Sequence, residues 1–507
     1  MAQNSGKSIQ PLLAGYGIEA PDIRITDLVL DSREVAIHKG FVAIKGHQRD
    51  GRDFIPQAIS LGAKVILAEC DEVQQHGALQ MREQSLIISF YRLATSLSEL
   101  ACRFYDYPAK AMDVVAVTGT NGKTSTVQLI TQWRHAVGEV CASVGTLGAG
   151  VYAGQQADLD ETVNTTPDAV QMPRLLADFV TQGVRQVALE ASSHALVQGR
   201  IAALDVNVAV FTNLTRDHLD YHGTMAEYAN AKRRLLAQPG LTHVVVNLDD
   251  PESRQWINAL PEQVQLIGIT RGKHAFSLPE GALLLRAEQT VFHSAGCDIQ
   301  LTGTFGQGIL SVSLLGAFNV HNVLCAMASL LALGVDFDTL LAKASSLHPV
   351  AGRMEVFSAP GSASVVVDYA HTPDALQQAL TAMADHCHGQ RWVVFGCGGD
   401  RDTGKRPLMG EVAERFADRI ILTNDNSRSE QPLAIVNDIL AGCRQPEAID
   451  IILDRKAAIQ SALQHAAPED MILVAGKGHE NYQIIGSDVL DYDERDYVKN
   501  TIKGNAQ

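Results

Sequence analysis

The segment from Val114 to Ser125 constrains the fold of this chain more than any other part of the sequence. Four apolar residues at 114–117 precede the run Thr-Gly-Thr-Asn-Gly-Lys-Thr-Ser, and an amphipathic stretch follows as far as Gly138. This order predicts a buried strand, a glycine-rich turn and a helix, an arrangement whose backbone N–H groups and helix N-terminus bind phosphate. A continuous apolar strand of this kind is typical of a parallel sheet with both faces covered.

The residues of the turn have expected roles in binding a nucleotide. We predict that Lys123 binds the β- and γ-phosphates and that the Thr124 hydroxyl ligates Mg²⁺. The spacing departs from the strict phosphate-loop pattern, because Val117 occupies the position of the first glycine. The turn therefore predicts ATP binding, but alone it does not separate a ligase from a motor, a switch or a kinase. The nucleotide-binding residues expected in it are Gly119, Thr120, Asn121, Gly122, Lys123, Thr124 and Ser125.

The chain has 507 residues, which is too many for one hydrophobic core, since single cores stop growing at roughly 250–300 residues. Short apolar runs alternate with helical stretches, so the sequence predicts an α/β fold with three domains at 1–110, 111–347 and 348–507. Antiparallel strands are expected between about 277 and 315, with 303–308 as a turn. Helices are expected at 93–104 and 317–333. Strands are expected at 25–30, 40–44, 64–68, 85–89, 113–117, 187–190, 206–211, 243–247, 365–368, 392–395, 420–423 and 471–475.

Charge and cysteine usage narrow the class of protein. The formal net charge of −16 would repel nucleic acids and anionic membranes, so we expect neither as a partner. Eight cysteines occur singly, without a C-x-x-C pair, which suits free thiols in a reducing compartment. No signal peptide and no apolar run of ~18–20 residues is present. We therefore expect a cytoplasmic protein that does not insert into a membrane.

Two further segments carry candidate metal ligands. Glu190 follows the apolar run 187–189, and His218 lies in the segment after the run 206–211. Because ligands gather outside the carboxyl ends of parallel strands, both side chains are expected near the phosphate-binding turn, where they could ligate Mg²⁺. Mg²⁺ prefers oxygen, so His218 would be an unusual ligand. The alternatives are a capping carboxylate for Glu190 and a buried neutral imidazole for His218. From the residues alone, Lys232 is a lysine on the face of a helix.

Taken together, the motifs of this chain resemble those of the Mur ligases, over essentially its whole length and in the same order. The motifs are T-G-T-N-G-K-T-S, E-A-S-S-H, F-T-N-L-T-R-D-H-L-D-Y-H-G, A-F-N-V-H-N, G-R-M-E, D-Y-A-H-T-P-D, F-G-C-G-G-D-R-D-x-G-K-R and G-K-G-H-E. The resemblance implies an N-terminal α/β domain for a UDP-linked precursor, a central phosphate-loop ATPase domain with a mostly parallel sheet, and a C-terminal Rossmann-like domain. It also implies ATP-dependent ligation through an acyl phosphate.

The resemblance changes the interpretation of Lys232. In similar enzymes the matching lysine is carbamylated and helps to hold a second Mg²⁺. The catalytic residues implied are Lys123, Glu190, His218 and carbamylated Lys232, and the metal ligands are Thr124, Glu190, His218 and Lys232. Further ATP-binding residues implied by the family pattern are Asn319, His321, Asn322, Arg353, Asp368 and His371.

The same resemblance assigns the other two substrates. The precursor-binding residues implied are Leu30, Ser32, His47, Gln48, Arg49, Asn164, Thr165, Thr166, Ser192, Gln198 and Arg200. The run Asp-Asn-Ser-Arg matches a family motif, D-N-P-R, of enzymes that accept meso-diaminopimelate, although serine stands here in place of proline. Its arginine can bind a distal carboxylate bidentately, and lysine as a substrate has no such carboxylate. The diaminopimelate-binding residues implied are Arg401, Asp425, Asn426, Ser427, Arg428, Gly476 and Glu480.

The resemblance thus implies a specific reaction in peptidoglycan precursor synthesis. ATP would drive addition of meso-diaminopimelate to UDP-N-acetylmuramoyl-L-alanyl-D-glutamate, with Mg²⁺ as the metal and the chain acting as a monomer. Four alternatives stay open at this point. They are the same ligation with L-lysine or another diamino acid, a Mur ligase adding an earlier or later residue, a folylpolyglutamate-type ligase, and a phosphate-loop NTPase without ligase activity.

Overall fold

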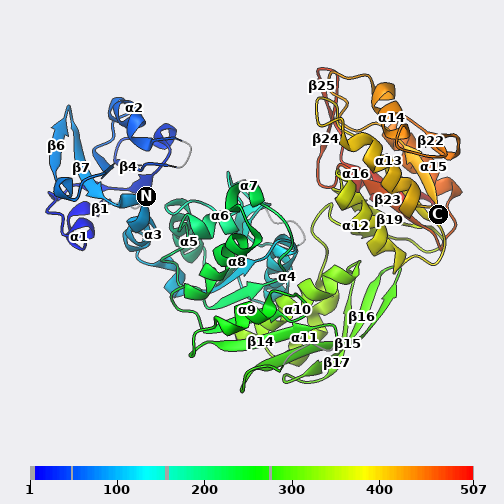
Figure 1. Cartoon of the computed structure of the whole chain (residues 1–507), viewed down its shortest axis with the longest axis horizontal. Coiled ribbons are helices and arrows are strands. Elements are labelled where there is room, and N and C mark those ends of the chain that lie inside the picture. The colour runs from blue at the N-terminus through cyan, green and yellow to red at the C-terminus, as the bar shows by residue number, and fades with distance from the viewer. Residues whose placement is uncertain (1–5, 47–48, 155–158, 161, 273–276, 506–507) are drawn as a thin grey trace. The chain divides into compact units, whose positions relative to one another are not determined.

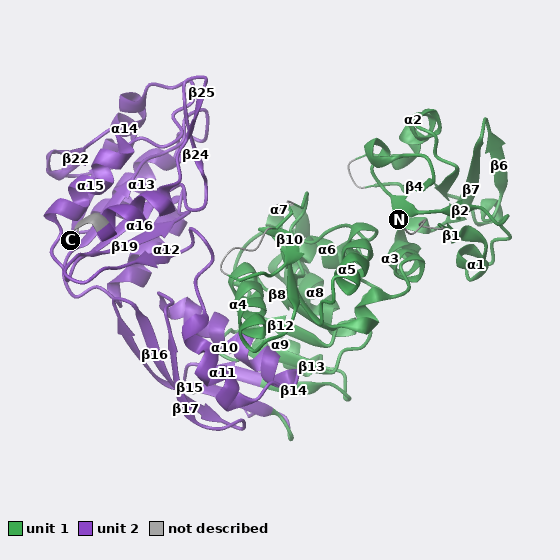
Figure 2. Cartoon of the chain, turned by 180° about the vertical axis from the view of Figure 1, so that it is seen from behind, with its two compact units in different colours: residues 1–267, 280–282 green, residues 268–279, 283–507 purple. Residues whose placement is uncertain are grey.

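The computed structural model describes residues 6–46, 49–154, 159–160, 162–272 and 277–505. Contacts within the chain divide it into two compact units (Figure 2). The first unit holds residues 1–267 and 280–282, and the second holds 268–279 and 283–507. The boundaries of the three expected domains stay a prediction.

The first unit begins with a five-stranded sheet, drawn in blue in Figure 1. The strand order is β3-β4-β5-β7-β6, and all neighbours are parallel except β6 and β7. Helix α3 packs on one face of the sheet, and α2 packs on the other. The strands are β3 (Asp27–Val29), β4 (Lys39–Ala43), β5 (Val65–Cys70), β6 (Leu79–Arg82) and β7 (Ser85–Tyr91), and the helices are α1 (Ile9–Ala14), α2 (Ile55–Ser60) and α3 (Leu93–Phe104). A small antiparallel pair, β1 (Lys7–Ser8) and β2 (Arg24–Ile25), lies beside them.

In the main sheet of the first unit, the strand that comes first in the chain, β8, lies at the centre. The strand order is β10-β9-β11-β8-β12-β13-β14, and the pairs from β9 to β13 are parallel. The strands are β8 (Asp113–Thr118), β9 (Cys141–Gly145), β10 (Gly148–Val151), β11 (Gln186–Glu190), β12 (Val208–Phe211), β13 (His243–Asn247) and β14 (Gln265–Thr270). The segments that follow β11 and β12 therefore flank the turn that follows β8.

Within the described residues, six helices occur in the connections between the strands of this sheet. They are α4 (Lys123–Ala136), α5 (Gln171–Thr181), α6 (Ser193–Val197), α7 (Leu219–His222), α8 (Met225–Arg233) and α9 (Ser253–Asn258). The apolar runs of the sequence form the strands because both faces of the sheet are buried: every residue from Val114 to Val117 has 0% exposure. Between the two sheets, the chain runs through a short 3₁₀ turn, Pro108–Ala111.

The second unit opens with three antiparallel strands, β15 (Leu283–His293), β16 (Gly296–Gly303) and β17 (Gly308–Val312). The expected turn at 303–308 joins β16 to β17, so that prediction is confirmed. Helix α10 (Ala317–Ala332) follows, and Gly334 just beyond it has φ +81°, the left-handed conformation in which helices commonly end. Helix α11 (Phe337–Lys343) packs near β17.

A six-stranded sheet makes up the rest of the second unit, in yellow to red in Figure 1. Its order is β18-β19-β23-β20-β21-β22, with β18 antiparallel to β19 and all other pairs parallel. Helices α12, α13 and α14 pack on one face, and α15 and α16 pack on the other. The strands are β18 (Glu355–Phe357), β19 (Ser364–Asp368), β20 (Arg391–Phe395), β21 (Arg419–Leu422), β22 (Asp450–Ile451) and β23 (Met471–Ala475). The other elements are α12 (Pro373–Ala384), α13 (Lys405–Phe416), α14 (Pro432–Leu440), α15 (Arg455–His465), α16 (Glu494–Asn505) and the hairpin of β24 (Tyr482–Ile485) and β25 (Asp488–Asp491).

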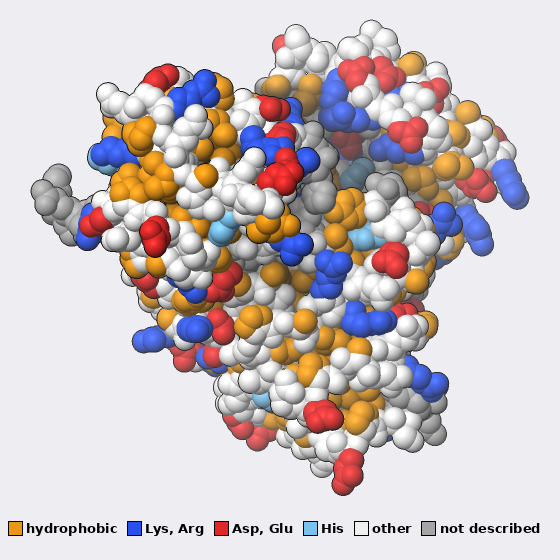
Figure 3. Space-filling view, turned by 60° about the vertical axis from the view of Figure 1, so that its left-hand side comes forward, with side chains coloured by type: hydrophobic (Ala, Val, Ile, Leu, Met, Phe, Trp, Pro, Cys, Tyr) orange, Lys and Arg blue, Asp and Glu red, His pale blue; other side chains and the backbone are white. Residues whose placement is uncertain are grey.

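The α/β fold class predicted from the sequence is confirmed. Among the described residues, no helix is both long and apolar enough to cross a membrane. On the face shown in Figure 3, basic and acidic side chains are interspersed rather than gathered by sign.

Candidate active site

The glycine-rich turn joins the central strand β8 to helix α4. Gly119 has φ +150° and Gly122 has φ +83°, so both adopt backbone conformations that other residues avoid. A Cβ on Gly119 would lie 1.9 Å from Thr212 Oγ1, because the segment after β12 packs directly on the turn. The Lys123 ammonium donates to the carbonyls of Gly119 (3.0 Å) and Thr120 (2.9 Å). The predicted strand, turn and helix are therefore present, with Lys123 folded over the turn.

Glu190 ends β11 and lies next to the first turn of α4. The carboxylate is 1% exposed and accepts hydrogen bonds from Thr124 Oγ1 (2.9 Å) and from the Thr146 backbone N–H (2.8 Å). Burial raises the pKa of Glu190, while the Thr146 N–H and the Lys123 charge act in the opposite direction. The structure thus brings together Lys123, Thr124 and Glu190, as the sequence predicted.

Lys232 lies on α8 and is also turned toward the phosphate-binding turn. It is 1% exposed, and its Nζ donates to the Gly119 carbonyl at 2.7 Å. Lys232 lies on a helix, as the residues alone predict, but its side chain is buried against the phosphate-binding turn. Burial lowers the pKa of Lys232 well below its ordinary value, and the nearby Lys123 charge lowers it further.

One aromatic ring contacts this lysine, and two imidazoles lie beyond that ring. Tyr228, one helical turn before Lys232, has its ring centroid 4.4 Å from the Lys232 Nζ, and its hydroxyl is 3.2 Å from Thr120 Oγ1. His218 is half-exposed, lies 3.4 Å from the Asp217 carboxylate, and has its ring 5.0 Å from that of His194. The sequence analysis missed Tyr228 and His194. Tyr228 had one available signal, the i, i+4 spacing from Lys232 that puts both side chains on one helix face.

The expected precursor-binding residues after β10 and β11 form a connected group. Thr166 Oγ1 donates to the Glu190 carbonyl (2.7 Å), Ser192 Oγ lies 3.2 Å from Thr166 Oγ1, and Arg200 donates to the Thr166 carbonyl (2.7 Å). Burial lowers the pKa of Arg200. Arg200 is thus a half-buried cation bound to the Thr166 carbonyl, and it also donates to Gln198 Oε1 at 2.9 Å. Thr165 Oγ1 lies 3.2 Å from Thr146 Oγ1, and Asn164 precedes it in the same loop.

The remaining precursor-binding predictions fall on the N-terminal sheet. Ser32 is buried and donates to Gln57 Oε1 at 2.9 Å, and Leu30 packs against the core of this sheet. Arg49 is exposed in the loop after β4. His47 and Gln48 lie outside the described residues. The structure therefore places Leu30, Ser32 and Arg49 on one part of the first unit without testing their role.

The other expected ATP-binding residues belong to the second unit. Asn319 and Asn322 are buried on α10, and the Asn322 side chain donates to Asn319 Oδ1 at 2.9 Å; His321 lies on the same helix. Asp368 ends β19 and accepts from the backbone N–H groups of Met354 (2.7 Å) and Ala370 (2.8 Å). Burial raises the pKa of Asp368 despite these bonds. Arg353 lies over the Tyr369 ring, and the His371 imidazole bonds to the Tyr369 carbonyl.

The expected amino-acid site is a loop that follows β21. Asn426 donates to Glu480 Oε2 (3.0 Å), while Arg428 donates to the carbonyls of Gly399 (2.9 Å) and Asn426 (3.4 Å). A Cβ on Gly476 would lie 2.5 Å from Asp425 Oδ2, so these two residues are adjacent as predicted. Ser427 is fully buried, and Arg401 is exposed in the loop after β20.

Lys477 is a functional candidate that the sequence analysis missed in this loop. It is 0% exposed, and its ammonium donates to Asn426 Oδ1 (3.1 Å) and Glu480 Oε2 (3.0 Å). The only signal for it was its place in the run G-K-G-H-E.

The donor atoms near the turn were tested for their fit to Mg²⁺. Within the described part of the chain, no three His, Cys, Asp or Glu side chains gather into a metal-binding group. The Thr124 hydroxyl and the Glu190 carboxylate lie side by side and are the oxygen ligands that Mg²⁺ prefers. The Lys232 amine is not such a ligand, whereas its carbamate would be. The residues therefore fit Mg²⁺, and Thr124 and Glu190 are the adjacent oxygen donors that could hold it.

A phosphate-binding turn at the centre of a parallel sheet, with a buried acid and a buried lysine beside it, defines a nucleotide-using α/β enzyme. Three family models match the sequence: the Mur ligase family catalytic domain at 24–105, the Mur ligase middle domain at 117–330, and the Mur ligase glutamate ligase domain at 352–478. The chain belongs to the Mur ligase family and is an ATP-dependent ligase.

Comparisons with individual proteins agree with this assignment. The chain is 46% identical over 478 residues, 94% of each chain, to the UDP-N-acetylmuramoyl-L-alanyl-D-glutamate–2,6-diaminopimelate ligase of Vibrio vulnificus (strain YJ016). A solved structure of a ligase of the same name has a TM-score of 0.76 at 33% identity, covering 99% of this chain and 100% of that one. The MurF ligase of Thermotoga maritima in complex with ADP has a TM-score of 0.56 at 19% identity, covering 95% and 97%, and it supports the fold alone.

Proposed function

We propose that this chain adds meso-diaminopimelate to the D-glutamate γ-carboxylate of UDP-N-acetylmuramoyl-L-alanyl-D-glutamate at the cost of ATP. The observation that carries the choice of amino acid is the arrangement around Asn426. A cation, Arg428, donates to the Asn426 carbonyl, and an anion, Glu480, accepts from the Asn426 side chain. The distal carbon of diaminopimelate bears both a carboxylate and an ammonium, so this pair matches it. L-Lysine has a distal ammonium but no distal carboxylate, so it would pair with Glu480 and not with Arg428. The Vibrio vulnificus relative, named for the same reaction, supports this choice.

The first unit supplies the groups for activating the carboxylate. In the proposed first step, a carboxylate oxygen attacks the ATP γ-phosphorus, the bond to the β-phosphate oxygen breaks, and an acyl phosphate and ADP form. Lys123 and the N–H groups at the start of α4 would stabilise negative charge on the phosphates. The amine of the amino acid then attacks the acyl carbon, loses a proton, and displaces inorganic phosphate.

Mg²⁺ is the metal that we propose for this site. Thr124 and Glu190, with His218 and carbamylated Lys232, would hold it, and when bound it would neutralise charge on the transferring phosphoryl group. Carbamylation needs a neutral amine, whose nitrogen forms a bond to CO₂ and releases one proton. The buried position of Lys232 favours the neutral amine, because burial disfavours the charged form.

The precursor is proposed to contact the first unit through two groups of residues. One belongs to the N-terminal sheet region and comprises Leu30, Ser32 and Arg49, to which the family pattern adds His47 and Gln48. The other is the group around Thr166, Ser192 and Arg200, which is hydrogen-bonded to the Glu190 backbone. ATP and a UDP-linked precursor are cytoplasmic compounds, so we place the reaction in the cytoplasm.

A competition assay tests the proposal. Purified protein is given ATP, Mg²⁺, the UDP-muramoyl dipeptide and equal amounts of meso-diaminopimelate and L-lysine, and the products are separated by mass. We expect the diaminopimelate product to dominate and ADP release to depend on the amino acid. A lysine product in excess would contradict the choice of amino acid. Equal ADP release without any amino acid would favour an NTPase instead.

A further inference from the structure

We propose that Arg406 is a positioning residue that sets selectivity for diaminopimelate. It does so by fixing the loop after β20 and the loop after β21 relative to each other around Arg428. This inference rests on the proposed function, because it concerns the amino-acid site of that reaction. Arg406 lies in the first turn of α13 and stands in the run G-K-R. Its side chain is 1% exposed, although it carries a permanent charge.

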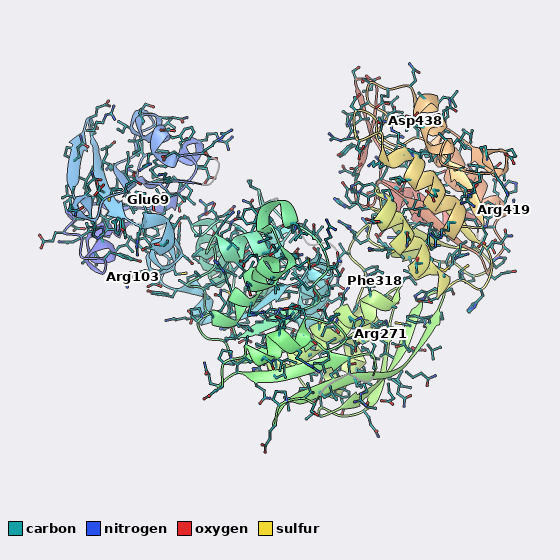
Figure 4. All side chains as sticks on the ribbon, viewed as in Figure 1. Glu69, Arg103, Arg271, Phe318, Arg419 and Asp438 are labelled. Atoms are coloured by element: carbon teal, nitrogen blue, oxygen red, sulfur yellow. The ribbon has the colours of Figure 1, made fainter. Side chains whose placement is uncertain are left out.

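The Arg406 guanidinium binds one carboxylate with both of its terminal nitrogens. Nη2 is 2.8 Å from Glu430 Oε1 and Nη1 is 2.8 Å from Glu430 Oε2, a bidentate pair. Nη1 also donates to Asp438 Oδ2 on α14 (2.8 Å), and Nη2 donates to the Gly398 carbonyl (3.3 Å). Figure 4 labels Asp438 on its helix. The pairing with Arg406 lowers the pKa of Glu430 to about 2, so this carboxylate stays charged at neutral pH.

Glu430 in turn joins the loop after β20 to the loop after β21. Its Oε1 accepts from the Asp400 backbone N–H at 2.6 Å, and its own N–H donates to the Ser427 carbonyl at 3.1 Å. Asp400 continues the connection, because its carboxylate accepts from the Ser429 hydroxyl (2.6 Å). Arg406 is thus bound to a carboxylate that contacts both loops.

The position of the Arg428 guanidinium depends on how these two loops lie relative to each other. Arg428 donates to the Gly399 carbonyl at 2.9 Å, and the Gly399 N–H donates to the Asn426 carbonyl at 2.9 Å. The loops are in direct contact, since a Cβ on Gly399 would lie 1.9 Å from the Ser427 carbonyl oxygen. Arg428 itself has φ +50°, a conformation that costs energy in a residue with a side chain. A shift of the loop at 398–400 would therefore move the group that is proposed to bind the distal carboxylate.

Ser427 makes the loop around Arg428 more dependent on contacts from outside it. Proline at this position, usual in the related motif, would fix φ and stiffen the loop. Serine does not, and its hydroxyl is buried without a hydrogen-bond partner among the described residues. The hydroxyl therefore adds no contact to hold the loop. The ion pair of Arg406 with Glu430 therefore constrains a loop that has no proline to stiffen it.

Substitution of Arg406 and Glu430 tests the inference in the full-length enzyme. For Arg406→Met and Glu430→Gln, kcat/KM is measured for meso-diaminopimelate and, at high concentration, for L-lysine, with ATP and precursor saturating. We expect the ratio of the two values to fall by about ten- to a hundredfold, the range that a small misplacement of a substrate-binding group produces. The KM for ATP should stay within about twofold of the wild-type value.

The matched control is Asp438→Asn. This substitution removes the second carboxylate that binds the Arg406 guanidinium but leaves the hydrogen bonds between Glu430 and both loops. We expect this variant to keep the wild-type ratio. An equal loss for both amino acids in the Arg406 and Glu430 variants would indicate a merely structural role and overturn the inference, as would an unchanged ratio. If Arg406→Met does not fold, Glu430→Gln decides alone, because it preserves shape and removes only charge. A wild-type enzyme that shows no preference for diaminopimelate would contradict the proposed function itself.

Discussion

At the scale of single residues, Lys232 shows how burial changes the chemistry available to a side chain. An ammonium that has lost most of its water is destabilised, and the adjacent Lys123 adds repulsion, so the neutral form is favoured. Lys232→Ala should lower the ligation rate by on the order of a hundredfold or more, the size of the loss when one charge-stabilising group is removed. Formate or acetate should restore part of the rate, since a small carboxylate can occupy the place of the proposed carbamate.

The control for this experiment is Lys123→Met, whose activity no carboxylic acid should restore, because the missing group is a cation. Direct detection of the carbamate by ¹³C NMR in ¹³C-bicarbonate gives a readout besides activity. If Lys232→Ala ligates at the wild-type rate, the proposed role of the Lys232 carbamate is wrong.

Arg428 is the second residue whose substitution has a specific expected effect. Hydrogen bonds to charged groups contribute about 1.5–3 kcal/mol, so Arg428→Ala should reduce kcat/KM for diaminopimelate by roughly ten- to a hundredfold. The KM for ATP should not change. Arg428→Lys is the matched variant: it keeps the charge but cannot form the bidentate pair, so an intermediate loss is expected. If Arg428→Ala impaired the kinetics for ATP as much as those for diaminopimelate, a role in binding the amino acid would be contradicted.

At the scale of elements, the C-terminus of α12 is joined to the start of α10 by a buried imidazole. His386, just after α12, is 0% exposed. Its Nε2 accepts from the Gly316 backbone N–H (2.8 Å), so its Nδ1 must carry the proton and donate to the His293 carbonyl (2.8 Å). Burial lowers the pKa of His386, and the His293 ring lowers it slightly more, while the His293 carbonyl and Asp385 raise it. A proton on Nε2 would break the bond to Gly316.

This geometry predicts how stability depends on pH. The unfolded chain takes up the proton near pH 6.5, and the folded chain takes it up only at lower pH. The contribution is therefore fully present above pH 6.5 and is lost as pH falls below that value, with a slope of at most about 1.4 kcal/mol per pH unit. In His386→Gln, which keeps a donor and an acceptor but does not titrate, urea unfolding should depend less on pH between about 7.5 and 5.5.

The exposed His465 provides the control for the His386 experiment. His465→Gln should leave the pH dependence of unfolding as in the wild type. If the wild type and His386→Gln lose stability in parallel over this range, the buried imidazole is not the titrating group.

The sequence predicted elements well where burial was uniform. The helix at 93–104 and the strands at 243–247 and 471–475 coincide with α3, β13 and β23, because apolar runs flanked by polar residues have sharp ends. Strand β6 was missed, because its alternation of Leu79 and Met81 with polar residues is only four residues long and all four are exposed. The strand expected at 206–211 begins only at Val208: Val206 is buried, but its N–H bonds to the Pro239 carbonyl outside the sheet.

At the scale of the whole molecule, what the sequence could not predict were contacts between segments distant in the chain. The place of Glu190 next to Thr124 followed from strand order, since β11 and β8 are neighbours in a parallel sheet. The burial of Lys232 did not, because it depends on how α8 packs beneath a turn more than a hundred residues earlier. Arg406 likewise has the sequence appearance of a surface arginine, and only the fold brings Glu430 and Asp438 to it.

The eight cysteines allow a prediction for the molecule as a whole. All are free thiols; six are buried, and Cys387 and Cys443 are intermediate in exposure. Burial raises the pKa of Cys443 to about 11 and that of Cys102, Cys141 and Cys325 to about 12, so few thiolates, the reactive form, exist at neutral pH. A thiol reagent should therefore modify the native enzyme slowly, at Cys443 and Cys387 first, and should react with all eight cysteines after denaturation without a reductant. Fewer than eight in the denatured chain would reveal a disulfide and contradict both the structure and the reducing compartment that the sequence indicates. Cys443→Ser, which removes one of the two accessible thiols, should halve the early phase of the native reaction.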